Sequence, residues 1–157
     1  MTPAIRLLEA SGVAFSIHEY ERGEELKDFG REAAESLGLP FDQVFKTLVV
    51  DLDDGRGMAV AVLPVSCLLS MKLVAAAFGA KRATMADQRA AERSSGYVVG
   101  GISPLGQKRV LRTAVDESAE LFDEIYVSGG RRGLDIAVAP ADLVRPLTNP
   151  NLARVTP

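Results

Sequence analysis

The run Val-Phe-Lys-Thr-Leu-Val-Val at residues 44–50 constrains the fold more than any other stretch. Its β-branched and apolar residues, which end shortly before a turn at 53–55, favour a strand over a helix. Because side chains alternate on a strand, Lys46 shares a face with Val44 and Leu48, and both faces are expected to be buried. A buried ammonium group is costly, so Lys46 must snorkel, pair with an acid or line a polar cavity. The last alternative makes Lys46 a candidate functional residue.

Turn and capping residues divide the rest of the chain into short helices and strands. Thr2 and Pro3 are typical of a helix start, and Gly12 of its end. The glycine-rich turn at 53–57 predicts an antiparallel hairpin between the lysine strand and a strand at 58–63. Helices and strands alternate without a strict βαβ rhythm, which predicts one α+β domain over residues 1–157, with a mixed, curved sheet flanked by short helices. Further predicted segments are strands at 124–127 and 134–138, a glycine turn at 128–133 and a loosely attached tail at 148–157.

Composition excludes several classes of function. No apolar run reaches the roughly 20 residues of a membrane span, and the first residues lack a secretory pattern, so we expect a cytoplasmic protein without membrane contact. Cys67 and His18 are the only cysteine and histidine of the chain, which excludes an internal disulfide and the usual zinc sets. We expect no cofactor and no metal, with carboxylate-bound magnesium left open. The net charge of −3 means that a polyanion could bind only at a local basic patch.

Neither His18 nor Cys67 is in a setting typical of nucleophilic catalysis. His18 lies in a predicted strand, far in sequence from Cys67 and from any glycine-rich serine turn, which favours a hydrogen-bonded surface histidine. Cys67 has apolar neighbours and no cation nearby in the sequence, so we expect an inert, buried thiol. A catalytic mechanism would therefore have to work without either side chain.

Two glycine-rich stretches, at 100–106 and 128–133, could expose N–H groups to a phosphate or an oxyanion. Neither matches the P-loop or dinucleotide pattern, and ordinary turns are an equal alternative. Asp135, in the strand that follows, either faces solvent or balances the charge of Lys46. Five basic residues flank the stretches and would form either an anion-binding rim or a solvated face: Lys108, Arg109, Arg112, Arg131 and Arg132.

Several of these stretches together resemble the YbaK-type Cys-tRNA(Pro) deacylases, free-standing relatives of the editing domain inserted in bacterial prolyl-tRNA synthetases. The likeness extends over nearly the whole chain and rests on the order and spacing of the motifs. They are Tyr20, Phe29-Gly30, Val44-Phe45-Lys46-Thr47-Leu48, Gly100-Gly101-Ile102-Ser103-Pro104-Leu105-Gly106 and Tyr126-Val127-Ser128-Gly129-Gly130 with Arg132-Gly133-Leu134-Asp135. The stretch 21–27 and the tail from Thr148 do not follow the pattern.

The resemblance implies an editing hydrolase that removes cysteine from tRNA(Pro) by attack of the cysteinyl thiol on its own ester. Such a mechanism needs no protein nucleophile, and the protein supplies positioning, desolvation and oxyanion support. The implied catalytic residues are Lys46, as an orienting cation, and Gly101, through its backbone N–H in an oxyanion site. The implied substrate-binding residues are Tyr20, Phe29, Thr47, Ser128 and Asp135.

The implied partners are the acceptor end of tRNA(Pro) and prolyl-tRNA synthetase. Two alternatives stay open at this point. A related pocket could edit another small aminoacyl-tRNA, such as the alanyl or seryl ester, because a pocket discriminates one methylene by only about 1 to 3 kcal/mol. A non-catalytic module could instead bind tRNA ends or a synthetase without hydrolysis.

Overall fold

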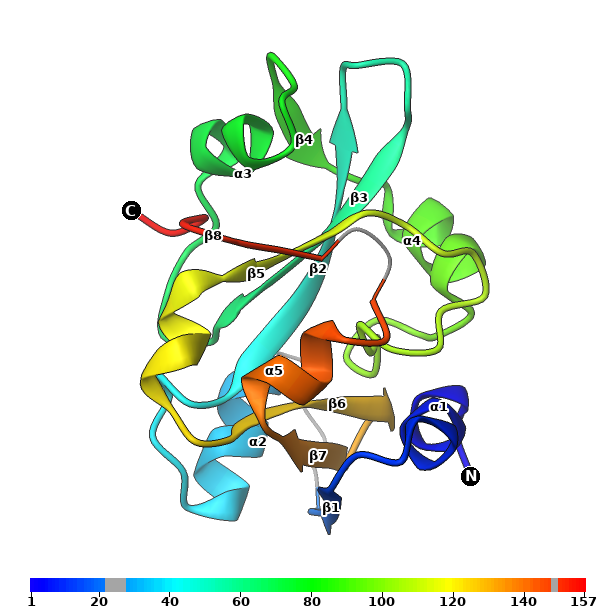
Figure 1. Cartoon of the computed structure of the whole chain (residues 1–157), viewed down its shortest axis with the longest axis vertical. Coiled ribbons are helices and arrows are strands. Elements are labelled where there is room, and N and C mark those ends of the chain that lie inside the picture. Colours follow the sequence, from blue (N-terminus) through cyan, green and yellow to red (C-terminus); the bar gives the residue numbers. More distant parts are fainter. Residues whose placement is uncertain (22–27, 148–149) are drawn as a thin grey trace.

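The computed structural model describes residues 1–21, 28–147 and 150–157 and contains two β-sheets with short helices packed around them (Figure 1). The five-stranded sheet has the order β4-β2-β3-β5-β8, and the three-stranded sheet has the order β1-β7-β6. The helical elements are α1 (Pro3–Ser11), α2 (Phe29–Leu37), α3 (Met71–Ala77), α4 (Gln88–Ser95), the 3-10 helix η1 (Glu117–Leu121) and α5 (Pro140–Val144). The strands are β1 (Phe15–Glu19), β2 (Phe45–Leu52), β3 (Met58–Pro64), β4 (Ala83–Met85), β5 (Thr113–Asp116), β6 (Ile125–Arg131), β7 (Leu134–Val138) and β8 (Pro150–Ala153).

The predicted α+β class with mixed pairing is confirmed, and its strands are divided between the two sheets. In the larger sheet, β3 pairs antiparallel with β2 and parallel with β5. The three-stranded sheet is antiparallel throughout. Among the described residues, no helix is long and apolar enough to cross a bilayer.

Local capping explains why α1 begins and ends where the sequence predicts. The Thr2 hydroxyl accepts a hydrogen bond from Ile5 N at 3.3 Å, and Gly12 ends α1 with a φ of +70°. In the same way, the Ser70 hydroxyl accepts from Leu73 N at 3.1 Å at the start of α3. These signals operate within one helical turn, so the sequence alone is enough to place them.

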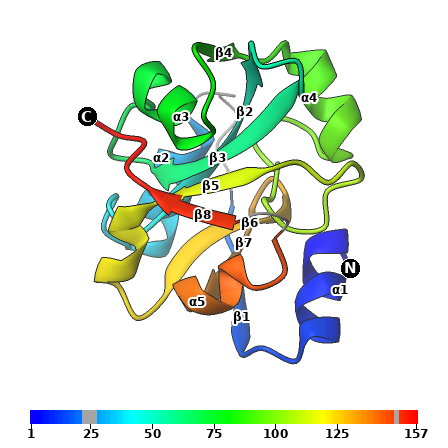
Figure 2. The same cartoon turned by 45° about the horizontal axis from the view of Figure 1, so that its top comes forward.

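Two segments differ from the sequence-based expectation. The predicted glycine turn at 128–133 is mostly strand, because β6 continues to Arg131 with an irregularity in its pairing after Ser128. The prediction of a loosely attached tail at 148–157 is wrong for its described part, which is bound to the rest of the fold. β8 pairs parallel with β5, as Figure 2 shows (β8 red, β5 yellow), and Val155 is fully buried. The buried Asp116 carboxylate accepts from Val155 N at 2.9 Å, which ties the tail to the end of β5.

The way the two sheets meet creates an opening beside β2. On the edge away from β3, β6 reaches β2 at a single bridge between Val44 and Tyr126. Further along that edge, β4 joins β2 from the pair of Val50 with Met85. The middle of β2 therefore lacks a neighbouring strand on this edge among the described residues. The main core lies elsewhere, between α1, the inner face of the three-stranded sheet and the strands β3 and β5.

Candidate active site

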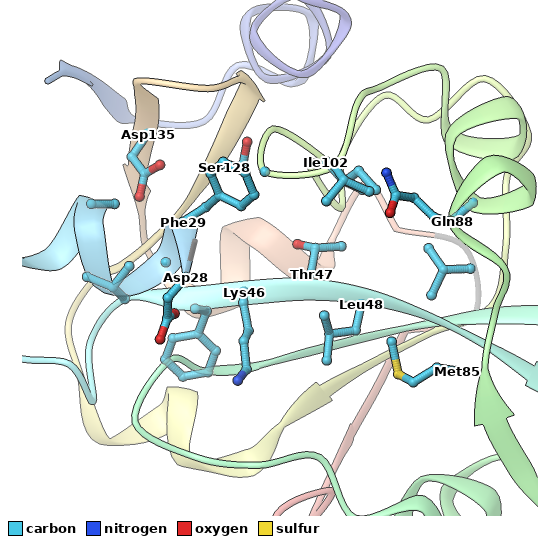
Figure 3. A pocket seen from close by; sticks show the side chains of 18 of the residues that line it. Asp28, Phe29, Lys46, Thr47, Leu48, Met85, Gln88, Ile102, Ser128 and Asp135 are labelled. Carbon is cyan, nitrogen blue, oxygen red and sulfur yellow. The ribbon is translucent and has the colours of Figure 1, made fainter. Parts of the chain in front are cut away.

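A cavity of about 390 Å³ lies beside the uncovered stretch of β2 (Figure 3). Its walls come from β2, from α2, from the loop that precedes Ile102, from β4 and α4, and from β6 and β7 of the smaller sheet. Val44, which immediately precedes β2, and the first five residues of β2, from Phe45 to Val49, line it without a gap. A cavity over one face of a strand would meet only alternate residues, so this one lies along the edge of β2.

Lys46 lies at the exposed end of this cavity. In Figure 3 its side chain leaves β2 on the side opposite to Thr47. Partial burial lowers the pKa of Lys46 below its usual value, and the charges of Asp28 and Cys67 oppose that shift. The expectation that both faces of the strand are buried is wrong here, because Lys46, Thr47 and Leu48 are each only partly buried.

Asp135 lies at the closed end. It is 4% exposed, and burial raises the pKa of its carboxyl to about 7. No hydrogen bond or ion pair of its carboxyl occurs within the described part of the chain. The sequence left open whether Asp135 balances Lys46, and in the structure no ion pair joins them. A buried carboxyl without a partner is costly to ionise, and a cationic ligand would reduce that cost.

Ser128 and Thr47 place two hydroxyl groups in the same cavity. Ser128 lies opposite Asp135 in the β6–β7 pairing, and its hydroxyl accepts from Gly130 N at 3.2 Å. The hydroxyl oxygen of Thr47 is buried and has no hydrogen-bond partner among the described residues. An unpartnered buried polar atom in a cavity wall is a place where a ligand can supply the missing hydrogen bond.

Phe29 of α2 and the Arg132 side chain hold the loop before Ile102 against α2. The guanidinium of Arg132 lies 4.8 Å from the centre of the Phe29 ring, and its Nε donates to Val99 O at 2.8 Å. Gly100 has a φ of +91°, and a Cβ atom there would come within 2.7 Å of the Phe29 ring. Glycine is therefore required at this position for both backbone conformation and space.

Gly101 does not occupy the oxyanion site that the family resemblance implies. It is not among the residues that line the cavity, and its N–H donates to Val98 O at 2.9 Å inside its own loop. That N–H is thus engaged and does not offer an oxyanion donor in this conformation. A Cβ atom on Gly101 would lie 2.7 Å from Arg131 Cα, so the glycine allows the two glycine-rich stretches to pack together.

Three of the five basic residues that would form either an anion-binding rim or a solvated face are engaged in contacts within the chain. Arg112 bonds to Asp54 at 3.0 Å in the β2–β3 turn, where this hydrogen-bonded pair lowers the pKa of Asp54 to about 2. Arg131 pairs with Glu19 at 3.2 Å, and Arg132 is held against Phe29.

The prediction for His18 is confirmed, and the prediction for Cys67 is wrong. His18 Nε2 lies 2.8 Å from the Ser16 hydroxyl, which confirms a hydrogen-bonded strand histidine. Cys67 is partly exposed and acts electrostatically on Lys46, so the expectation of a buried thiol without a nearby cation is wrong.

The sequence model of the family described as "Aminoacyl-tRNA editing domain" matches residues 24–145. The chain belongs to this family. It is also 36% identical over 155 residues to "Putative Cys-tRNA(Pro)/Cys-tRNA(Cys) deacylase EbsC" of Enterococcus faecalis (strain ATCC 700802 / V583), covering 99% of this chain and 93% of that protein.

Two solved structures share the fold of this editing domain. One is described as "Crystal structure of a putative trans-editing enzyme for prolyl tRNA synthetase", with a TM-score of 0.82 and 21% identity, and covers 100% of this chain and 99% of its own. The other, hypothetical protein APE2540, has a TM-score of 0.85 and 24% identity, with 99% of each chain covered. At these identities the likeness concerns the fold alone.

In this editing domain, the structure brings most of the predicted site residues to one cavity. Those that line it are Tyr20, Phe29, Lys46, Thr47, Ser128 and Asp135. Sequence reasoning missed the opposite wall, formed by Met85, Ala86, Gln88 and Ala91. α4 carried only the ordinary signals of a capped helix, and only the packing of β4 and α4 beside β2 brings these residues to the cavity.

Proposed function

We propose that this chain is an aminoacyl-tRNA deacylase that removes cysteine from tRNA(Pro), and that the whole chain acts as one editing domain. One observation carries the proposal: the hydroxyl groups of Ser128 and Thr47 in the cavity have no basic side chain bonded to them in the described residues. A serine or threonine nucleophile needs an adjacent base. An ester substrate that brings its own thiol removes that need.

The proposed reaction has two steps. The cysteinyl thiolate attacks the carbonyl carbon of its own ester, so a carbon–sulfur bond forms while the bond to the ribose oxygen breaks. The ribose oxygen takes up a proton, equivalent to the one that the thiol lost, and the tRNA leaves. Water then opens the cyclic thioester to free cysteine. The cavity contributes orientation and exclusion of water.

The cavity residues have different parts in this proposal. Lys46 lies toward the exposed end, where its ammonium group suits the phosphate of the terminal nucleotide. Phe29 and Tyr20 form walls that confine the aminoacyl group, and Ser128 and Asp135 close the far end with polar groups. Gly101 acts through packing of its loop and not through its N–H.

A protein partner is part of the proposal. The net charge is −3, and three of the basic residues beside the glycine-rich stretches are engaged within the chain, so affinity for tRNA alone should be modest and should fall with salt. One relative is named as an enzyme acting on Cys-tRNA(Pro), and one structural neighbour as a "putative trans-editing enzyme for prolyl tRNA synthetase". We therefore propose that prolyl-tRNA synthetase supplies the selection of the tRNA.

A deacylation panel tests the proposal. Purified protein is given cysteinyl, S-methylcysteinyl, seryl, alanyl and prolyl esters of tRNA(Pro), and cysteinyl esters of other tRNAs. We expect rapid loss of the cysteinyl ester and little loss of the S-methylcysteinyl ester, which has nearly the same shape but cannot attack. Equal rates for alanyl and cysteinyl esters would overturn cysteine specificity. Specific tRNA binding without any hydrolysis would show a non-catalytic module instead.

A further inference from the structure

Hydrogen bonds on the two sides of β2 determine where each of its peptide groups points. On the β3 side, Val44 O accepts from Val65 N at 2.8 Å. On the opposite side, Val49 O accepts from Ala86 N at 3.0 Å. In an antiparallel strand, the N–H and C=O of one residue point the same way and successive residues alternate. The pairing of β2 with β3 has no irregularity, so the main chain of Thr47 points away from β3, as Val49 does.

Thr47 lies where that outer edge is uncovered. Before it, Gln43 O accepts from Tyr126 N at 3.1 Å, where β6 bridges β2. After it, β4 begins to cover the edge at Val49 O. In the described chain no strand lies against the stretch between these two points, and the cavity fills the gap. Both main-chain polar groups of Thr47 therefore face the cavity, beside the hydroxyl that also lacks a partner.

An unpaired strand edge accepts another strand residue by hydrogen bonding to its main chain. An aminoacyl ester carries an α-ammonium donor and a carbonyl acceptor on the two neighbours of its Cα, in the same arrangement as the N–H and C=O of one residue. Two residues directly opposite each other in an antiparallel pair can exchange both hydrogen bonds. The gap beside Thr47 is therefore complementary to a single aminoacyl unit.

We propose that the substrate's aminoacyl group docks on β2 as one added strand residue opposite Thr47. The Thr47 N–H donates to the ester carbonyl, and the Thr47 C=O accepts from the α-ammonium. This inference rests on the proposed function and adds to it the donor that Gly101 does not provide. The N–H bond strengthens as negative charge develops on the ester oxygen during attack, so it contributes to the rate and not only to binding.

Docking through the main chain has a consequence for specificity. The Thr47 edge recognises atoms that all aminoacyl esters share, so it holds any amino acid in the same register. Discrimination between amino acids then comes from the walls around the side chain and from the chemistry of that side chain. In the proposed reaction, the edge presents the carbonyl carbon to the thiol of a cysteinyl group.

Substitution of Thr47 tests the hydrogen bond that its N–H donates to the ester carbonyl. Thr47→Val keeps the N–H and removes the hydroxyl, so it sets the reference, whereas Thr47→Pro removes both. Proline is tolerated where the N–H does not join a ladder. We expect Thr47→Pro to fold and to have a kcat about 100-fold or more below that of Thr47→Val. The matched control, Leu48→Pro, removes an N–H that faces β3 and should lower the melting temperature sharply. A folded Thr47→Pro protein with the kcat of Thr47→Val would overturn the proposal.

A modified substrate tests the hydrogen bond from the α-ammonium to the Thr47 C=O, and it does so on the unaltered protein. It therefore still tests the proposal if Thr47→Pro does not fold. The 3-mercaptopropionyl ester of tRNA(Pro) retains the thiol and the ester but has no amino group. We expect its kcat/KM to be at least about 10-fold below that of the cysteinyl ester, mainly through KM. Equal kcat/KM for the two esters would contradict the added-strand arrangement. Failure of the wild type on the cysteinyl ester itself would instead contradict the proposed function.

Discussion

At the scale of single residues, burial changes the protonation of the Asp135 carboxyl in the cavity wall. Its carboxyl has no partner in the described structure, and its pKa is raised to about 7 by burial alone. The unfolded chain has the ordinary value near 3.8, so the folded protein binds the proton more tightly. The contribution of this group to stability is therefore highest below pH 4 and is lost as the pH rises toward 7. That cost is consistent with a residue retained for binding.

The first prediction concerns Asp135→Asn, which has nearly the same shape but no charge to bury. Above pH 7 the variant should be more stable than the wild type, by up to about 4 kcal/mol at 1.36 kcal/mol per pKa unit. Near pH 4 the two proteins should be similar. Urea unfolding at pH 4, 6 and 8 measures the difference, with the exposed Asp51→Asn as control. A constant difference across this range would contradict the raised pKa, and deacylation should fall despite the added stability.

The second prediction concerns Lys46→Met, which keeps the aliphatic stem and removes the ammonium group. The folded state should be kept, because partial burial already disfavours the charge. Deacylation of the cysteinyl ester should fall about 100-fold or more if the cation positions the substrate. Lys72→Met, at an exposed position in α3, should leave the rate unchanged. A rate within about threefold of wild type for a folded Lys46→Met protein would remove Lys46 from the mechanism.

At the scale of elements, the contact of Gly100 with Phe29 shows how the cavity keeps its shape. Gly100→Ala would place a methyl group 2.7 Å from the ring at a positive φ, so Phe29 or the loop must move. The third prediction is a loss of about 2–4 kcal/mol in unfolding free energy together with weaker deacylation. Gly55→Ala is the matched control, because its φ is also positive, at +76°, but nothing lies within 4 Å. Equal losses for both variants would show that only backbone strain matters.

At the scale of the whole molecule, the C-terminal strand β8 forms one edge of the larger sheet, and Asp116 anchors the residues that follow it. This carboxylate is 2% exposed and accepts from Ser118 N at 3.3 Å and from Val155 N at 2.9 Å. The fourth prediction is that Asp116→Ala lowers the unfolding free energy by about 2–4 kcal/mol, since buried donors lose their acceptor. Thermal unfolding measures this loss, with the exposed Asp123→Ala as control. Activity per folded molecule should stay near wild type, and a large loss would show that the tail shapes the cavity.

Local interactions explain which elements could be predicted from the sequence. The start and end of α1 depend on Thr2, Pro3 and Gly12, and the β2–β3 hairpin depends on a turn next to both strands. β8 could not be predicted in this way. It pairs in parallel with β5, which is far away in the sequence, and parallel pairing leaves no turn signature.

The same distinction between local and long-range interactions applies to the candidate site. The sequence by itself determined that Lys46 interrupts an apolar strand, that His18 lacks the setting of a nucleophile, and which motifs carry the family likeness. Only the tertiary structure decided that the Gly101 N–H is engaged, that Asp135 lies apart from Lys46, and that the edge of β2 is open at Thr47. Residue type and spacing set the chemistry of each side chain. Pairing between distant strands sets which main-chain groups are left without partners.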